Sequence, residues 1–211
     1  KVLMMGKING QDEKPYQMDA RGILQSYLEA LNKKNQYTVY VANEVEGFLV
    51  KGIDAEQLFN EKVGFELVSM GGYYHSLPND VLRNFIDRAA EAQRAMGFEN
   101  EKDHPEVAPS QFELNYSYAD AIIAADQIQI YKLICRQIAR NMGMTATFLP
   151  KPVMGINGSG MHTNISIFSK GRNLFHDRSG RGQLSDLAWK FIDKILSNAN
   201  DICLILNSSV N

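Results

Sequence analysis

The chain has 211 residues, of which 45% are hydrophobic, so it can bury a sizeable core and is not expected to be disordered. Its 22 basic and 24 acidic residues nearly cancel, which argues against a nucleic-acid partner. No apolar run has the length of a membrane span, so we expect a cytoplasmic protein with no membrane partner. Cys135 and Cys203 lie far apart in apolar stretches, which predicts buried, reduced thiols.

Helices and strands alternate along the chain. Apolar residues at helical spacing predict helices at about residues 19–32, 80–96 and 119–142, and from residue 185 onward. Alternation, or a short buried run, predicts strands at 37–50, 111–115, 145–149 and 161–167. The polar strand faces are expected to point away from the helices, and the pattern indicates an α+β or α/β fold.

Glu44 and Glu46 stand two residues apart on the first of these strands, so both point to the same face, about 6.6–6.8 Å apart. An exposed, solvated strand face would explain them. Acidic residues are poor strand formers, however, and two unpaired carboxylates on one face repel each other. A bound cation, or a pair of cations, is the alternative interpretation.

The segment 97–115 carries five acidic residues and one histidine and is too broken by proline for a helix. A solvated loop is one interpretation. Pro109 and the apolar pair Val107-Ala108 indicate instead a rigid, partly buried segment, in which carboxylates need partners. At its end, Gln111–Asn115 alternates and predicts a strand with one polar face, on which Glu113 lies.

The stretch from Lys151 to Ser166 reads KPVMGINGSGMHTNIS. Its glycines allow the backbone to approach a ligand closely. Its second half alternates, which places His162, Asn164 and Ser166 on one strand face. A surface hairpin with a wet face would give the same pattern, and the loop matches neither the P-loop nor the dinucleotide-binding motif.

Four separated places thus offer hard or borderline metal ligands, and they converge if the predicted strands share one sheet. They are Glu44 with Glu46, Glu106, Glu113 and His162. Several carboxylates and one imidazole suit Mg²⁺ or Mn²⁺ better than structural Zn²⁺. Carboxylate-rich metal sites with open positions bind phosphate oxygens, so phosphoryl transfer is the chemistry we expect.

Ordered blocks of the sequence resemble the glutamine synthetase family, and the resemblance spans nearly the whole chain. The blocks are Glu44-Val45-Glu46, Gly71-Gly72-Tyr73, Glu106-Val107-Ala108-Pro109 with Gln111-Phe112-Glu113, and Lys151-Pro152 with Asn157-Gly158-Ser159-Gly160-Met161-His162 and Ser166. The resemblance implies an α+β fold, in which an antiparallel sheet lines a funnel-shaped active site and helices back it. It also implies a ligase of nitrogen metabolism: the γ-carboxylate of glutamate attacks ATP, and ammonium then displaces phosphate from γ-glutamyl phosphate.

The metal ligands that the resemblance implies serve at least two ions of Mg²⁺ or Mn²⁺ per site. Glu46, Glu106 and Glu113 match the ligands of one divalent ion. Glu44 and His162 match ligands of the second ion. Metals at these places would withdraw charge from the γ-phosphate of ATP.

Substrate contacts follow from the same resemblance. The residues that match ATP contacts are Glu101, Asn164 and Ser166. Asn157 and Gly158 match the glutamate-binding loop, where close approach of the backbone explains the glycine. Tyr73 and Glu106 match catalytic groups near the ammonium pocket, where an anionic rim attracts ammonium and helps to deprotonate it.

Three departures from the family pattern leave the acceptor amine open. His104-Pro105-Glu106 stands where many members have His-His-Glu, Gly47 follows Glu46 where an aromatic residue is usual, and Asn164 stands where many have a second histidine. Ligases that join glutamate to polyamines or other amines resemble the chain too. A non-catalytic relative that binds metal and nucleotide is the alternative from a different class.

Residues 1–211 are expected to be an internal part of the catalytic domain, truncated at both ends. The chain lacks an initiator methionine and ends just after an apolar run. The family's N-terminal small domain and its C-terminal part, with the remaining metal glutamate and several arginines, are not within it. We therefore expect this part alone to be inactive, and the full-length protein to be a ring-shaped homo-oligomer, a dodecamer, with sites between subunits.

Overall fold

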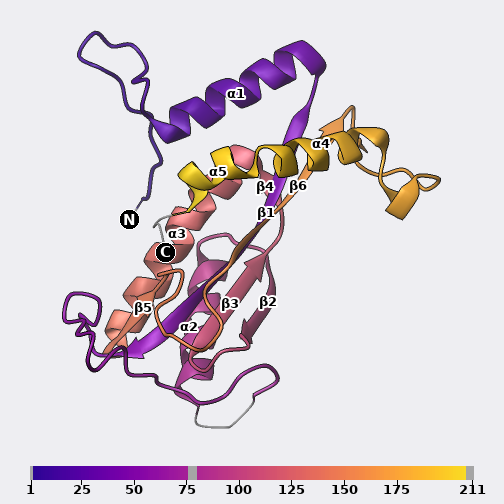
Figure 1. Ribbon diagram of the computed structural model, residues 1–211. Helices are drawn as coiled ribbons and strands as arrows, with labels where there is room; N and C mark the ends of the chain where they lie inside the picture. Colours follow the sequence, from indigo (N-terminus) through magenta and orange to yellow (C-terminus); the bar gives the residue numbers. More distant parts are fainter. Residues whose placement is uncertain (1, 76–79, 208–211) are drawn as a thin grey trace. The chain divides into compact units, whose positions relative to one another are not determined.

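The computed structural model describes residues 2–75 and 80–207, which divide into two compact units (Figure 1). The sheet unit comprises Val41–Ala119 and Ile123–Asn164. The helical unit comprises the described parts of Lys1–Tyr40, Asp120–Ile122 and Ile165–Asn211. All candidate site residues except Ser166 belong to the sheet unit.

The sheet unit is built on one long strand, β1, to which shorter strands attach. Its elements are β1 (Thr38–Lys51), α2 (Val81–Ala95), β2 (Asn100–Pro105), β3 (Gln111–Tyr116), α3 (Ala121–Asn141), β5 (Met144–Thr147) and β6 (Met161–Ser169). β1 pairs antiparallel with β3 and with β5, and β2 pairs antiparallel with β3 (Figure 1). β6 lies next to β1, where the Glu46 N–H donates to the Gly160 carbonyl at 3.0 Å.

One face of this sheet carries the apolar core and packs on α2 and α3. The fully buried side chains of the core include Leu49, Leu82, Phe85, Ile86, Phe112, Leu114, Tyr131 and Cys135. The Tyr131 hydroxyl donates to the Val45 carbonyl at 2.9 Å, which satisfies a polar group that burial would otherwise leave unpaired. Because strand side chains alternate, burial of Phe112 and Leu114 on one face turns Gln111 and Glu113 to the other.

Helix α2 shows how the local sequence sets these elements. The Asp80 carboxylate caps the helix by accepting from the Leu82 N–H at 3.2 Å. Phe85, Ile86 and Ala89 recur at helical spacing and are fully buried against the sheet. Burying a side chain as large as that of Phe85 contributes about 1.5–3 kcal/mol, so the apolar stripe holds α2 behind β2 and β3.

The helical unit contains the remaining elements. They are α1 (Ala20–Asn35), β4 (Ala119–Asp120, of which Asp120 lies in this unit), β7 (Arg172–Asn173), a 3₁₀ turn (Arg181–Gln183), α4 (Asp186–Ser197) and α5 (Ala199–Leu206). The last residues of β6 pair antiparallel with β7. The Ser185 hydroxyl caps α4 by accepting from the Ala188 N–H at 3.2 Å.

The structure confirms the α+β fold class, the antiparallel sheet and its polar face turned away from the helices. β2 was predicted as an irregular segment, because its charged residues hide the strand pattern. The apolar stretch around Cys203 was expected to be helical without stated bounds, and it forms α5. Cys135 is buried as expected, whereas Cys203 is exposed, because α5 leaves its apolar side chains at the surface.

Candidate metal centre and active-site cleft

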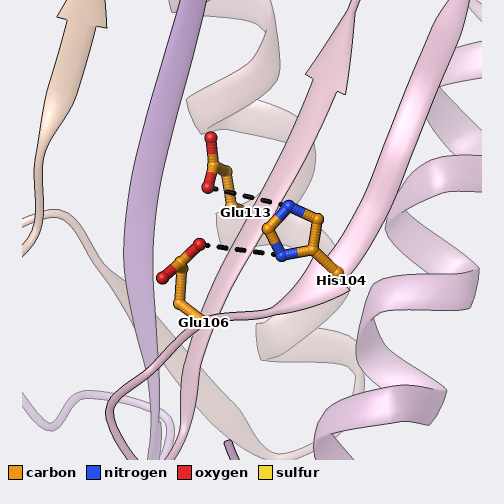
Figure 2. A group of neighbouring side chains, drawn as sticks. All are labelled: His104, Glu106 and Glu113. Atoms are coloured by element: carbon orange, nitrogen blue, oxygen red, sulfur yellow. Dashed lines mark ion pairs between the residues drawn. The ribbon is translucent and has the colours of Figure 1, made fainter. Parts of the chain in front are cut away.

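Two carboxylates and one imidazole meet on the polar face of the sheet. His104, Glu106 and Glu113 each offer a ligand atom, and these atoms lie within 4.8 Å of one another (Figure 2). The His104 Nδ1 atom is 3.7 Å from Glu106 Oε1, and its Nε2 atom is 3.8 Å from Glu113 Oε2. Three potential ligands at this separation could hold one divalent ion.

The pairing of β2 with β3 explains this convergence. His104 on β2 lies directly opposite Glu113 on β3. Glu106 follows β2 in a tight turn, in which its N–H donates to the Gln111 carbonyl at 2.8 Å. The turn therefore brings three side chains to the same face of the sheet. They are His104 before the turn, Glu106 at its start and Glu113 on β3 after it.

Burial sets the electrostatics of the carboxylate pair. Glu106 and Glu113 are each only 6% exposed. Burial, followed by the hydrogen bond with Glu106, raises the pKa of Glu113 to about 7. Burial also acts to raise the pKa of Glu106, but hydrogen bonds from Glu113, Tyr73 and the Val107 N–H outweigh it and hold that pKa below its ordinary value. The raised pKa favours a proton on Glu113 near neutral pH, and a bound cation would offset the same charge.

Tyr73 extends the cluster toward solvent. Its hydroxyl donates to Glu106 Oε1 at 2.6 Å, and the Val107 N–H donates to Glu106 Oε2 at 2.9 Å. The hydrogen bond to Glu106, and then burial, raise the pKa of Tyr73 to about 12, so the phenol stays protonated. Gly72 lets this segment approach closely, since a Cβ there would lie 2.9 Å from the Val107 carbonyl oxygen.

Glu46 reaches the same face from β1, where its Cα is paired with that of Glu113. Its Oε2 atom accepts from the Gln111 side-chain amide at 2.8 Å and from the Gly160 N–H at 3.0 Å. Within the described residues, both of these hydrogen bonds go to Oε2. The Oε1 atom of Glu46 is thereby left for another ligand.

A second cluster lies where β6 runs along β1. The His162 Nδ1 atom is 3.1 Å from Glu44 Oε2, and the Asn164 amide donates to Glu44 Oε1 at 3.1 Å. With its proton on Nδ1, His162 presents the lone pair of Nε2. A Cβ on Gly160 would lie 3.0 Å from Glu46 Oε1 and 3.2 Å from His162 Nε2. Glu46 and His162 therefore both lie close to Gly160, where a larger residue would press on them.

A cleft of about 640 Å³ opens beside these groups. It is lined by Glu44, Tyr73, Tyr74, His75, Arg83, Lys102, His104, Pro105, Glu113 and Asn115. Members of both clusters and Tyr73 are thus exposed to the same space. Such a volume is in the range of a small-molecule site.

Three other predicted contacts, Glu101, Asn157 and Gly158, do not line this cleft. Glu101 is exposed on β2 and accepts from the Ser117 hydroxyl at 3.0 Å. Asn157 is an exposed loop residue. Gly158 accepts from Gln111 through its carbonyl at 2.8 Å. Ser166 lies on the part of β6 that belongs to the helical unit.

Sequence reasoning missed His104 and the buried amide of Gln111. His104 was noted only as part of a departure from the family pattern. Its position two residues before Glu106 was the available signal, because strand alternation places both residues on one face. Gln111 was placed on the polar strand face, but its two bonds to Glu46 and Gly158 required the structure.

Gly47, a predicted departure, has a structural reason. A Cβ there would lie 2.7 Å from Phe112 Cζ and 3.0 Å from Phe148 Cε1. The two rings, with centroids 6.0 Å apart, occupy the space that a larger residue would need. Phe112 and Phe148 therefore leave room for glycine at position 47.

Comparison with known proteins agrees with this architecture. Residues 17–211 match the family model described as the glutamine synthetase catalytic domain. Glutamine synthetase of Thermus thermophilus is 38% identical over 211 residues, covering 95% of this chain and 44% of that protein. Glutamine synthetase of Staphylococcus epidermidis is 38% identical over 202 residues with the same coverage. The chain belongs to the glutamine synthetase catalytic-domain family.

Solved structures show the same fold. Plasmodium falciparum glutamine synthetase superposes with a TM-score of 0.83 at 25% identity, covering 97% of this chain and 45% of that one. GmaS in complex with ADP superposes with a TM-score of 0.79 at 26% identity, covering 94% of this chain and 45% of that one. The chain spans about 44% of the length of the curated relatives it matches. No helix in residues 2–75 and 80–207 is long and apolar enough to cross a membrane.

Proposed function

We propose that the full-length protein is an ATP-dependent ligase that joins the γ-carboxylate of glutamate to an amine, with ammonium as the first candidate. The observation that carries this proposal is the buried pair Glu106 and Glu113, with Tyr73 bonded to Glu106, beside a cleft in a chain of this family. A relative solved with ADP supports a nucleotide substrate. Residues 1–211 would then be an internal part of the catalytic domain of a cytoplasmic, ring-shaped homo-oligomer.

The residues present fit Mg²⁺ or Mn²⁺. Two buried carboxylates face each other with a single imidazole between them, and hard divalent cations prefer oxygen ligands. Glu46, Glu106 and Glu113, with His104 beside them, would hold one ion, and Glu44 and His162 would hold a second. When bound, the ions supply positive charge that offsets the charge of the phosphates.

The side chains of this chain then have defined tasks. Glu106 is kept anionic by its hydrogen bonds, so together with Tyr73 it would attract an ammonium ion to the acceptor pocket, where the ion loses a proton before the neutral amine nitrogen attacks. Asn157 and Gly158 would hold glutamate, and Glu101, Asn164 and Ser166 would contact ATP. The γ-carboxylate attacks the terminal phosphorus, ADP leaves, and the amine nitrogen displaces phosphate from γ-glutamyl phosphate.

The direct test is phosphate release from ATP by the full-length protein with Mg²⁺ and glutamate, across ammonium and a panel of larger amines. Ammonium-dependent release supports glutamine synthesis. Release with a larger amine alone assigns the protein to the sister ligases and makes Pro105, Gly47 and Asn164 the residues to exchange. Nucleotide binding without release with any amine contradicts the proposal and favours a non-catalytic relative.

The Tyr73→Phe variant tests the acceptor pocket within the same assay. Loss of the hydroxyl removes one hydrogen bond that keeps Glu106 anionic, so KM for the amine should rise on the order of tenfold. Tyr73 is not itself a proposed ligand, but its hydroxyl orients Glu106, so Mn²⁺ affinity should fall by about tenfold as well, and the KM is therefore measured at saturating Mn²⁺. An unchanged KM would remove Tyr73 from the acceptor pocket.

A further inference from the structure

The Gln111 side chain joins the carboxylate of Glu46 to the backbone of the glycine loop at Gly158. This side chain is fully buried on the polar face of β3. Burial of an amide is unfavourable unless its polar atoms are paired. Here the Nε2 group donates to Glu46 Oε2 and to the Gly158 carbonyl, each at 2.8 Å, and Oε1 accepts from the Ala108 N–H at 3.2 Å.

These partners fix the orientation of the amide. Rotation by 180° would turn Oε1 toward a carboxylate and a carbonyl, which offer no proton, and Nε2 toward an N–H donor. Only one orientation of the amide satisfies all three partners. A buried amide locked in this way holds Glu46 Oε2 and the Gly158 carbonyl at a fixed separation.

Both partners are constrained on their other sides. Glu46 is held by the Gly160 N–H at 3.0 Å as well. Gly158 is packed so tightly that a Cβ on it would lie 2.4 Å from the Pro150 carbonyl oxygen, and the next residue, Ser159, donates to that same oxygen at 2.8 Å. If the Glu46 carboxylate shifts, the Gln111 amide must move with it, and the Gly158 carbonyl must then move as well.

We propose that Gln111 is a positioning residue that couples metal binding at Glu46 to the conformation of the loop 156–160. This inference rests on the proposed function, in which Glu46 is a metal ligand and the loop 156–160 binds glutamate. An ion that engages Glu46 fixes its carboxylate, and Gln111 passes that constraint to the Gly158 carbonyl. Because such coupling is reciprocal, an ordered loop also tightens metal binding.

The test uses the full-length protein, Mn²⁺ as the probe and two readouts that require no turnover. The first is the Mn²⁺ Kd, and the second is amide hydrogen exchange of the loop 156–160 with and without Mn²⁺. In wild type, Mn²⁺ should slow exchange in the loop. In Gln111→Met, the Kd should rise by about 10–100-fold, the range seen when partners of metal ligands are removed, and the effect of Mn²⁺ on loop exchange should disappear.

Gln93→Met is the matched control. Gln93 is equally buried, but it lies on α2 and accepts a hydrogen bond from Asn100, away from the cluster. It should lower stability without changing the Mn²⁺ Kd or the response of the loop. If Gln111→Met fails to fold, Gln111→Asn serves, because its amide is one methylene shorter and no longer reaches Glu46 and Gly158 from the same backbone position; the loop must lose its response there too.

Each outcome decides the inference. If the Mn²⁺ Kd or the loop response of the Gln111 variants equals that of wild type and Gln93→Met, the coupling role is wrong. If wild type binds Mn²⁺ but releases no phosphate with any amine, the proposed function fails, while the coupling is still read from Kd and exchange. If activity is present, loss of coupling should also raise KM for glutamate more than it lowers kcat.

Discussion

The two clusters on the polar face differ in exposure, although both are made of carboxylates and histidine. Glu106 and Glu113 are buried to 6% exposure, with His104 between them. In the second cluster, the His162 side chain is 66% exposed and that of Glu44 is 39% exposed. Water can screen the charges of the exposed cluster, whereas the buried pair must share a proton or bind a cation. Burial, more than the number of acidic residues, therefore marks the stronger metal site.

The largest effect is expected from Glu113→Gln. The substitution removes a buried ligand, so Mn²⁺ affinity of the full-length protein should fall on the order of 100-fold or more, and activity with it. Without metal the variant should be more stable than wild type, because the repulsion within the buried pair is gone. Titration of Mn²⁺ and a thermal unfolding midpoint measure both. A variant that binds Mn²⁺ like wild type would show that the buried pair is structural.

Gly160→Ala should affect both clusters at once. The new Cβ would lie 3.0 Å from Glu46 Oε1 and 3.2 Å from His162 Nε2, so both groups must move by a few tenths of an ångström. We expect a loss of about tenfold in Mn²⁺ affinity, smaller than for Glu113→Gln because no ligand is removed. Gly155→Ala, on the same loop but with open space around the site of its Cβ, is the control for loop strain alone.

His162→Ala should have the smallest effect, because the exposed cluster contributes less. Affinity for the weaker of the two Mn²⁺ ions should fall by about tenfold or less, and the unfolding midpoint should not change. Mn²⁺ titration at low and high occupancy separates the two ions. An effect as large as that of Glu113→Gln would overturn the ranking of the clusters, and no effect on either ion would remove His162 from the ligands.

Much of this site could be predicted because strand alternation is a local property. Glu113 and Gln111 on one face, and His162 with Asn164 on one face, follow from spacing two residues apart, and the structure bears both out. The same reasoning placed the polar face away from the helices. Four ordered motifs then indicated the family, which the match over residues 17–211 shows.

The rest depends on register, which spacing does not specify. The β2–β3 pairing places His104 opposite Glu113. The charged residues of β2 do not alternate with apolar ones, so the sequence does not predict this strand. The role of Gln111 depends on contacts across 65 and 47 residues of sequence. Exposure of Cys203 likewise depends on what packs on α5, which an apolar run does not reveal.

If the buried pair Glu106 and Glu113 is a cation site, the stability of the metal-free protein should depend on pH. Because the pKa of Glu113 is raised from 4.5 to about 7, the folded protein binds more protons than the unfolded chain between these values. The contribution of Glu113 to the free energy of unfolding is therefore present at low pH and is lost as the pH rises through about 7. This loss is on the order of 1–3 kcal/mol.

The measurement is the thermal unfolding midpoint of the full-length protein from about pH 5 to pH 8, with and without Mn²⁺, for wild type and Glu113→Gln. We predict that the metal-free midpoint of wild type falls relative to that of the variant as the pH rises, and that Mn²⁺ stabilises wild type increasingly over the same range. A metal-free midpoint with the same pH dependence in both proteins, or equal stabilisation of both by Mn²⁺, would contradict a cation site at Glu106 and Glu113.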